Sequence, residues 1–332
     1  MKKLLTLAVA AAMTLSVAAA SATTLKLSEV HAEGYPTTLA DQEFARLIEE
    51  KTEGRIKVEV YSGGQLYGEE TGSIEALQLG DIAFARVSAS PVASYVPALN
   101  AIQMPYLYKN ADHMWAVLDG EIGKDMLAQI EASGSGLVGL CWYDAGARSY
   151  YTTKKVASVA DMKGLKIRMQ NNAMMVDMTN VLGGTGVTGI GPNEVYSAIK
   201  QGTIDGAENN WPTYQNMGDY ELDEHTRVPE ILLASAEVLS SLDPADVEII
   251  KQCAIETEAY EKAKWAEKEE SSEKIVREAG CTIVELTPEA FAEFQAAMTN
   301  PSDALGGQSL YEKYGAKYQD VIDAITKVGE AY

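Results

Sequence analysis

The sequence predicts an α/β protein that consists of two similarly built lobes. Three observations support this fold class: the chain length, an alternation of strand and helix patterns, and a short internal repeat. The chain has 332 residues, and about 310 remain once an N-terminal leader is removed. That length exceeds what one hydrophobic core normally serves, so two domains are expected.

The N-terminal part of the chain alternates between strand and helix. Leu25–Val30 alternates in polarity as a strand does, and the next segment places Ala40, Phe44 and Ile48 at helical spacing. A βαβα order implies a parallel sheet with helices on its faces. The predicted elements are strands at 25–30, 56–61 and 82–85 and helices at 37–51 and 69–79.

A weak internal repeat indicates that the second lobe is built like the first. Ala76–Ile82 resembles Ala198–Ile204, and each segment combines a helix end, a glycine and the entry to a strand. Coincidence is the alternative, because this arrangement is common. Taken with the chain length, the repeat favours two α/β lobes.

One long helix is predicted towards the C-terminus. Asp243 is a suitable N-cap, Pro244 suits the first helical position, and no stop follows until Gly280. At 1.5 Å per residue this helix is about 54 Å long. It therefore exceeds one lobe and is expected to brace both. Thr287 and Pro288 form a second cap pair, which opens a terminal helix.

The first 22 residues have the pattern of a cleavable export signal. Two lysines precede an apolar stretch that ends at about Ala20, and a small-residue cleavage pattern ends at Ala22. A transmembrane anchor is the alternative, but the stretch is short and ends at a processing pattern. No cysteine lies near the cleavage point, so a lipid anchor is not expected. The sequence predicts a periplasmic protein whose mature chain begins after Ala22.

The formal net charge of −21 restricts the partners. A surface this acidic argues against nucleic acid and against anionic membrane. It also repels an anionic ligand. A site for such a ligand must therefore supply local positive charge.

The sequence lacks the patterns of common enzyme classes. His31, His113 and His225 have no metal-ligand spacing with one another or with a cysteine, and no nucleophile elbow is present. Gly184–Gly189 matches the dinucleotide fingerprint, but it follows a predicted helix and precedes extended chain, the reverse of the required context. We expect no metal, no cofactor and no catalytic residues.

The three cysteines match no zinc or redox motif. Cys141 lies in an apolar run and is expected to be a buried small side chain. Whether Cys253 and Cys281 form a disulfide stays open.

The strongest candidate for a binding group is Arg168. Leu165 and Ile167 face one side of a predicted strand, whereas Lys166 and Arg168 face the other. Arg168 thus ends a strand on its polar face, where α/β proteins commonly bind ligands. Arg148 lies in a comparable strand or crossing segment. A solvated surface position is the alternative for each arginine.

At these residues the chain resembles the solute-binding proteins of tripartite ATP-independent periplasmic (TRAP) transporters. The likeness covers essentially the whole mature chain, and the order and spacing of its segments make it specific. These segments are Lys51–Val58, Ile74–Gly80, Lys163–Arg168, Glu194–Ile199 and Asp205–Asn210.

The resemblance implies a two-lobed periplasmic-binding-protein clamshell with mixed, mostly parallel sheets and a long brace helix between the lobes. Lobe I is expected to comprise 23–145 and about 229–268, and lobe II 146–228 and about 269–332. The resemblance also assigns Arg168 to a ligand carboxylate and gives it Arg148 and Asn209 as ligand-facing neighbours. A guanidinium suits this task because its planar fork binds a carboxylate bidentately and stays charged in a closed cleft.

Within that family the chain looks most like the branch that binds hexuronates such as glucuronate or galacturonate. The segments that carry this likeness include His31, Asp144–Tyr151 and Glu208–Pro212. Glu70, Gln170, Asn209 and Asn210 are expected to serve the sugar hydroxyls, with Trp211 as an apolar ring face and Arg86 as added charge. For Trp211 and Tyr214, packing between the lobes is an equal alternative.

The predicted function is that of a receptor without catalytic activity. It captures a small organic acid by lobe closure and delivers it to the membrane permease subunits of a TRAP transporter, and we expect it to act as a monomer. The alternatives are a C4-dicarboxylate or sialic-acid binder of the same family, or a periplasmic sugar-acid lyase. The chain departs from the family between Glu221 and Leu222, where related proteins carry a longer segment. The effect of this shortening on closure stays open.

Overall fold

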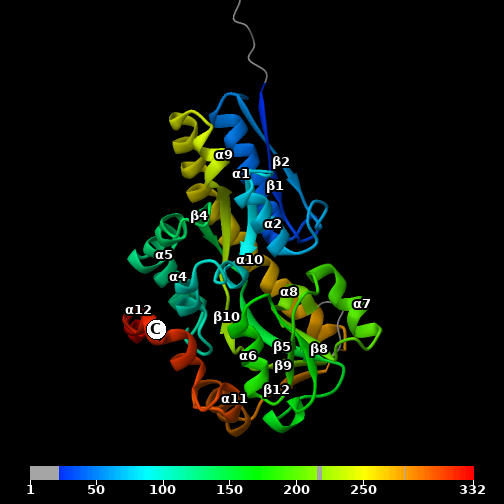
Figure 1. Ribbon diagram of the computed structural model, residues 1–332. Coiled ribbons are helices and arrows are strands. Elements are labelled where there is room, and N and C mark those ends of the chain that lie inside the picture. Colours follow the sequence, from blue (N-terminus) through cyan, green and yellow to red (C-terminus); the bar gives the residue numbers. More distant parts are fainter. Residues whose placement is uncertain (1–21, 215–218, 281) are drawn as a thin grey trace, which may run out of the picture.

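The computed structural model describes residues 22–214, 219–280 and 282–332 and has the predicted two lobes. In Figure 1 the two lobes lie above and below a central junction, and α10 (Pro244–Glu278) runs from one to the other. The first sheet and its helices are called lobe I here, and the second sheet and its helices lobe II. The expected leader, 1–22, falls almost entirely outside the described residues.

Lobe I contains a five-stranded sheet in the order β2-β1-β3-β11-β4. Its strands are β1 (Thr23–Ser28), β2 (Ile56–Tyr61), β3 (Phe84–Ser88), β4 (Leu137–Tyr143) and β11 (Glu230–Ser235). Its helices are α1 (Pro36–Lys51), α2 (Glu70–Gln78), α3 (Ala89–Val92), α4 (Ala111–Leu118), α5 (Glu121–Ala132) and α9 (Ala236–Ser240), with a 3-10 segment at Pro97–Gln103. All three N-terminal strands and both intervening helices are therefore present as predicted, and the third strand begins two residues later than expected.

Lobe II contains a second sheet, with the order β12-β9-β5-β8-β6-β7 and with β10 paired to β5. Its strands are β5 (Ala147–Thr152), β6 (Lys166–Arg168), β7 (Thr185–Val187), β8 (Gly206–Asn209), β9 (Asp219–Leu222), β10 (Thr226–Arg227) and β12 (Ile283–Glu285). Its helices are α6 (Ala173–Val181), α7 (Val195–Lys200), α8 (Trp211–Tyr214) and α11 (Pro288–Thr299). Strand β9, which spans the Glu221–Leu222 point where the family resemblance implies a shortened segment, pairs with both β5 and β12.

The two sheets are mixed, as predicted, but parallel pairs do not predominate. In lobe I, β1 pairs in parallel with β2 and β3, whereas β11 is antiparallel to both of its neighbours. In lobe II, β5 is antiparallel to β8, β9 and β10. The expectation of mostly parallel sheets is wrong because strands that cross between the lobes enter each sheet against its βα units.

The internal repeat corresponds to equivalent turns in the two lobes. Helix α2 is followed by Gly80 and helix α7 by Gly202, and both glycines have a positive φ, 72° and 71°. This left-handed conformation is the usual helix ending at a glycine. The next strands, β3 and β8, carry Arg86 and Glu208 to the junction between the lobes.

The chain crosses between the lobes at 144–146 between β4 and β5, at 228–229 between β10 and β11, along helix α10 (Pro244–Glu278), and once more after α11. The first is a tight turn, in which Asp144 Oδ1 accepts hydrogen bonds from the N–H groups of Ala145 and Gly146, each at 2.8 Å. Gly146 has φ 62°, and a Cβ there would lie 2.5 Å from Glu269 Oε1 of α10. The positive φ favours glycine here, and any larger residue would also have to displace the Glu269 carboxylate of the brace helix.

Helix α10 begins as predicted and braces both lobes. The Asp243 side chain caps it by accepting a hydrogen bond from the Ala245 N–H at 2.8 Å. The helix packs against α1 and β4 in lobe I and against α8 in lobe II. Its buried Trp265 and Glu261 contact the junction, where Glu261 Oε2 accepts the Asp144 N–H at 2.9 Å.

The C-terminal segment differs from the prediction of one terminal helix. Thr287 caps α11 as expected, but α11 ends at Thr299 and a further helix, α12 (Gln319–Val328), follows. Helix α12 packs against α4 and the 97–103 segment of lobe I. His113 of α4, predicted to be structural, is buried with its Nε2 2.8 Å from the Ile325 carbonyl oxygen. The end of the chain thus returns to lobe I, although 269–332 was expected in lobe II.

Cys141 and Cys253 are buried in lobe I. Cys281 lies outside the described residues, so its pairing with Cys253 stays untested. No helix in the described part of the chain is both long enough and apolar enough to span a membrane.

Candidate functional site

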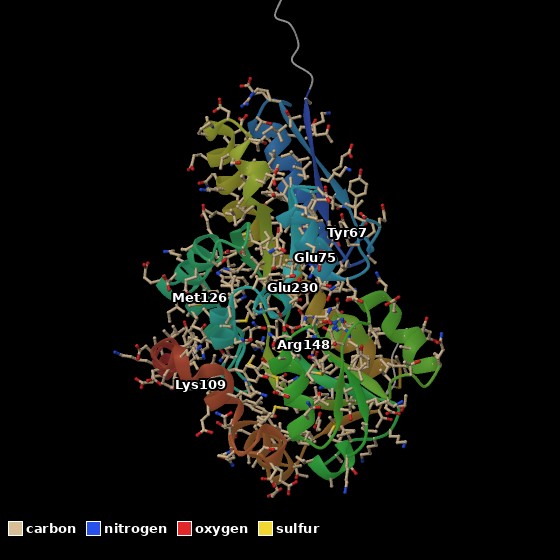
Figure 2. The ribbon with its side chains drawn as sticks, viewed as in Figure 1. Tyr67, Glu75, Lys109, Met126, Arg148 and Glu230 are labelled. Carbon is tan, nitrogen blue, oxygen red and sulfur yellow. The ribbon has the colours of Figure 1, made fainter. Side chains whose placement is uncertain are left out.

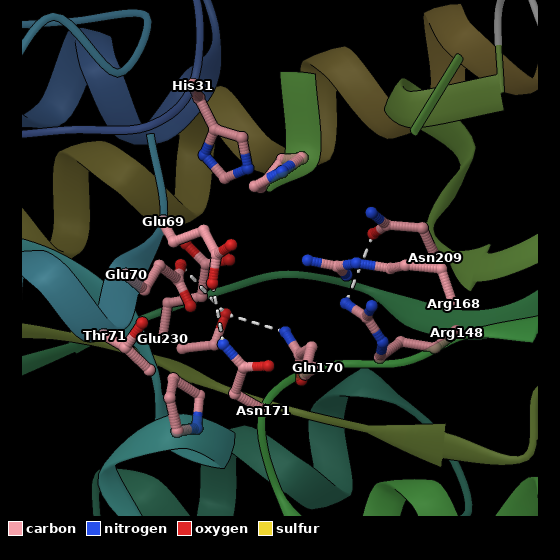
Figure 3. A pocket seen from close by; sticks show the side chains of 13 residues that line it. His31, Glu69, Glu70, Thr71, Arg148, Arg168, Gln170, Asn171, Asn209 and Glu230 are labelled. Carbon is pink, nitrogen blue, oxygen red and sulfur yellow. Dashed lines mark hydrogen bonds between the residues drawn. The ribbon is translucent and has the colours of Figure 1, made fainter. Parts of the chain in front are cut away.

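A polar pocket lies between the two lobes, at the carboxyl ends of several strands (Figure 3). Figure 2 places Arg148 and Glu230, two of its residues, near the centre of the molecule. The lining consists of His31, Glu69, Glu70, Thr71, Ser88, Pro91 and Glu230 from lobe I and of Arg148, Arg168, Gln170, Asn171, Pro192 and Asn209 from lobe II. Six of the nine residues expected from the sequence therefore meet here: Arg168, Arg148, Asn209, Glu70, Gln170 and His31.

Arg168 is the last residue of β6 and is half-buried. Its Nε donates a hydrogen bond to the Ile190 carbonyl oxygen at 2.9 Å, which fixes the guanidinium plane. Burial lowers the pKa of Arg168, and Arg148 adds to this, while Glu208 acts in the opposite direction. Among the described residues, no carboxylate forms an ion pair with Arg168. Its positive charge is thus available to a ligand.

Arg148, by contrast, is held by a carboxylate of its own lobe. Because β5 and β8 are antiparallel neighbours, Arg148 and Glu208 lie side by side in the buried centre of the sheet. Arg148 Nε and Nη2 donate to the two carboxylate oxygens of Glu208 at 2.5 and 2.9 Å, and Nη1 donates to Asn209 Oδ1 at 3.2 Å. The pair fixes Arg148 and Asn209 in the pocket wall formed by lobe II. We call Arg148 and Arg168 the positive wall.

A second ion pair supports Glu208 from behind. His225 Nε2 lies 3.6 Å from Glu208 Oε2, and His225 Nδ1 lies 3.0 Å from Asp223 Oδ1. The His225 ring also stacks on Tyr150, with 4.5 Å between ring centroids. Burial opposes a charge on His225, but Asp223 and Glu208 outweigh it and raise its pKa to about 9. Arg148 and His225 in turn lower the pKa of Glu208 to about 2, against the effect of its burial.

Arg86 lies behind the pocket wall of lobe I rather than in the pocket lining. Its fully buried guanidinium contacts three carboxylates: Glu29, Glu70 at 2.6 Å and Glu230 at 2.9 Å. Its charge therefore serves these carboxylates. Glu69, Glu70 and Glu230 line the pocket on this side, and we call them the acidic wall.

Asn210 and Trp211 also lie outside the pocket lining. Asn210 is buried; its Nδ2 donates to the Ala145 carbonyl oxygen at 3.0 Å and its Oδ1 accepts from Tyr35 OH at 3.3 Å. Trp211 packs in the lobe II core with Tyr151 and Val276, a residue of α10. The packing alternative thus describes Trp211 better than a ring face for the ligand. The Tyr214 side chain is outside the described residues.

The sequence analysis missed Glu69, Asn171 and Glu230 as pocket residues. Glu230 opens an otherwise apolar strand, Glu230–Ser235, and nothing local distinguishes it from a glutamate exposed at a strand end. Only its pairing with Ser88 on β3 and Tyr143 on β4 places it between the lobes.

The cleft is closed, because hydrogen bonds join its two sides. Gln170 Nε2 donates to Ser88 Oγ at 2.9 Å, and Asn171 Nδ2 donates to Glu69 Oε2 at 2.9 Å. At the outer edge, Asn193 Nδ2 donates to the Val30 carbonyl oxygen at 3.1 Å. The Gln170 Oε1 atom is buried in the pocket and has no hydrogen-bond partner among the described atoms. Its acceptor capacity is therefore unused within the described part of the chain.

No group of three or more His, Cys, Asp or Glu side chains within the described ranges is arranged to hold a metal ion. Carboxylates and guanidinium groups dominate the pocket instead. Such a site can bind a polar anion in a fixed orientation.

The profile of a family described as "Bacterial extracellular solute-binding protein, family 7" (DctP) matches residues 27–305. The chain belongs to this family. Family 7 proteins are the periplasmic receptors of TRAP transporters; they bind small organic acids and work with membrane permease subunits.

Solved family 7 structures share the whole fold. A TRAP solute-binding protein of Pseudomonas putida F1 with bound D-glucuronate is 36% identical, with a TM-score of 0.83 over 91% of this chain and 96% of its own. One of Xanthobacter autotrophicus Py2 with bound β-D-galacturonate is 34% identical, with a TM-score of 0.83 over 91% and 99%. A solute-binding protein of Chromohalobacter salexigens is 33% identical over 91% of this chain and 88% of its own.

Because of the buried His225, the free energy of unfolding of this family 7 protein should fall as the pH becomes alkaline. Its pKa of about 9 in the folded state exceeds the ordinary 6.5. The stability it contributes is therefore complete below pH 6.5 and is lost as the pH rises through 9. The expected loss is on the order of 3 kcal/mol of unfolding free energy, measurable by urea denaturation at pH 6 to 10.

The His225→Gln variant should lose this dependence whatever its absolute stability. An unchanged slope of unfolding free energy against pH in the variant would show that another group titrates.

Proposed function

We propose that this protein captures a hexuronate, such as glucuronate or galacturonate, and delivers it to a TRAP permease. The observation that carries the proposal is the division of charge across the pocket. Lobe II presents the positive wall and lobe I the acidic wall. A sugar acid suits both walls, because it carries a carboxylate at one end and hydroxyl groups elsewhere.

Arg168 is the proposed carboxylate partner. It is the pocket arginine that forms no ion pair among the described residues, and the cleft around it is closed. A charged hydrogen bond is stronger when water is excluded, since the effective dielectric constant falls. This local term overcomes the repulsion expected from a protein of net charge −21. Arg148 and Asn209 flank the same end of the ligand.

The hydroxyl groups have acceptors on the other side. Gln170 Oε1 is a buried acceptor without a partner among the described atoms, and Glu70 has a carboxylate that is largely buried at the pocket. His31, whose ring stacks on Tyr35 with centroids 4.1 Å apart, borders the same space. The bound hexuronates of the two related structures support this ligand class.

The proposal also includes export of the protein and the absence of enzymatic activity. The first 22 residues act as a cleavable signal, so the exported protein should begin at Thr23 on N-terminal sequencing. The protein acts as a monomeric receptor and not as an enzyme. Hexuronates incubated with it should be recovered unchanged by mass spectrometry, and a lyase product would contradict this.

Arg168→Ala should weaken hexuronate binding by about tenfold to several hundredfold, because a charged hydrogen-bonded partner contributes on the order of 1.5–3 kcal/mol. Titration calorimetry with D-glucuronate and D-galacturonate measures the change. Arg46→Ala, which removes an exposed arginine of α1 paired with Glu43 and Glu50, is the matched control and should bind as the wild type does.

A ligand screen by thermal shift separates the alternatives. Hexuronates at large excess should stabilise the protein by several kcal/mol, whereas succinate, malate and sialic acid should not. Tight binding of a C4-dicarboxylate or sialic acid without hexuronate binding would overturn the ligand assignment. Binding of hexuronates that Arg168→Ala leaves unchanged would overturn the role of Arg168.

Closure over the ligand should depend on Gly191. Its φ of −63° suits any residue, but a Cβ there would lie 2.5 Å from the Gly68 carbonyl oxygen across the cleft. Gly191→Ala should therefore weaken D-galacturonate binding by about tenfold, because overpacking of the closed state costs on the order of 1–3 kcal/mol.

Gly68→Ala is the control for Gly191→Ala, since a Cβ at Gly68 meets nothing within 4 Å. Small-angle X-ray scattering of the ligand-saturated proteins should give a larger radius of gyration for Gly191→Ala than for the control. Equal affinity and equal dimensions would show that this contact does not limit closure.

A further inference from the structure

The carboxylates around Arg86 outnumber its charge. Glu29, Glu70 and Glu230 all contact this one guanidinium, and the side chains of Glu70 and Glu230 are only 12% and 5% exposed. Glu29 takes the bidentate position: Arg86 Nε donates to its Oε2 at 3.0 Å and Arg86 Nη2 donates to its Oε1. Glu70 and Glu230 therefore share the remaining nitrogen, Arg86 Nη1, and both border the ligand pocket.

Of the carboxylates in this cluster, Glu230 has the fewest hydrogen bonds to neighbouring groups. Its Oε2 lies 2.9 Å from Arg86 Nη1, but in a geometry that makes no hydrogen bond, and that atom has no other hydrogen-bond partner among the described residues. Glu69, the third acid of the wall, is engaged by Asn171 across the cleft. A buried carboxylate without hydrogen bonds is costly, so a ligand donor at Glu230 would offset that cost.

We propose that Glu230, together with Glu70, determines ligand selectivity by accepting hydrogen bonds from ligand hydroxyls and by repelling a second carboxylate. This inference rests on the proposed function, since it specifies which sugar acids the same pocket accepts. In Figure 3 the two glutamates lie opposite Arg148 and Arg168. An acid held by the positive wall therefore presents its other end to Glu70 and Glu230.

The repulsion depends on the charge of Glu230, and the pKa of this carboxyl is set by its buried neighbours. Burial, with Glu70 and Glu29 nearby, raises the pKa of Glu230, while Arg86 and His31 oppose this. The Arg86 and His31 charges hold the pKa of Glu29 well below its usual range, despite its burial. A rise in pH favours the ionised form of Glu230, which is the form that repels a second carboxylate. A like charge brought next to an ionised carboxylate in such a site disfavours binding.

The test compares a hexuronate with the open-chain aldarate in which a second carboxylate replaces C1 of the sugar. Dissociation constants of D-galacturonate and galactarate are measured by titration calorimetry for the wild type and Glu230→Gln. Titration at pH 8 favours the ionised form of Glu230. The wild type should prefer galacturonate, and Glu230→Gln should reduce the ratio of the two constants by about tenfold, equivalent to 1.4 kcal/mol.

Two further variants make the result specific. Glu75→Gln removes an exposed carboxylate from the same helix as Glu70 and should keep the wild-type ratio. Glu230→Asp keeps the charge on a shorter side chain, so it should keep the wild-type ratio even where it binds both acids more weakly. Circular dichroism confirms that each variant is folded.

The outcomes separate the two proposals. Failure of the wild type to bind any hexuronate overturns the proposed function. Normal galacturonate binding with an unchanged ratio in folded Glu230→Gln overturns the selectivity role of Glu230 and leaves the proposed function intact. If Glu230→Gln is unfolded, a relaxed ratio in Glu230→Asp contradicts the inference.

Discussion

A guanidinium without a carboxylate partner is the feature on which the site depends. Arg168 lies in a closed cleft, bonded to a carbonyl oxygen, and forms no ion pair with the described residues. In a protein of net charge −21 with many acidic side chains, such an arginine is normally paired. The surrounding structure instead directs the nearest carboxylates to other cations: Glu208 to Arg148 and His225, and Glu29, Glu70 and Glu230 to Arg86. The pocket is thus positive at one side and acidic at the other.

The division of charge across the pocket follows from the connections between the lobes. Strands β4 and β5 are joined by three residues, and β10 and β11 by two, so each sheet ends at the junction. Residues at these strand ends face the cleft, among them Glu230 from lobe I and Arg148 from lobe II. Lobe closure then brings the two walls together, and α10, which packs on both lobes, limits how they move. The same geometry buries the ion pairs that hold Arg148 and Arg86, and burial makes these pairs sensitive to the loss of one partner.

Sequence patterns predicted the parts of this structure that local rules determine. The caps at Asp243 and Thr287, the strand at 56–61 and the glycine endings at Gly80 and Gly202 follow from backbone preferences. The alternation of polar and apolar residues placed Arg168 at a strand end, and the family resemblance supplied its role.

Arg86, Asn210 and Trp211 were expected in the pocket but lie outside its lining, because a sequence does not reveal which partner satisfies a polar or aromatic side chain. Glu230 was missed for the same reason: only the pairing of β11 with β3 and β4 takes it to the ligand. The prediction of mostly parallel sheets was wrong because the strands that follow a crossing between the lobes, β5 and β11, are antiparallel to their neighbours.

A crystal structure of the complex with D-galacturonate tests the central claim, the division of charge across the pocket, most directly. The account predicts that the ligand carboxylate lies within hydrogen-bonding distance of Arg168, with ring hydroxyls directed towards Glu70 and Glu230. A ligand bound in the opposite orientation, with its carboxylate against the acidic wall, or bound outside this cleft, would contradict the account.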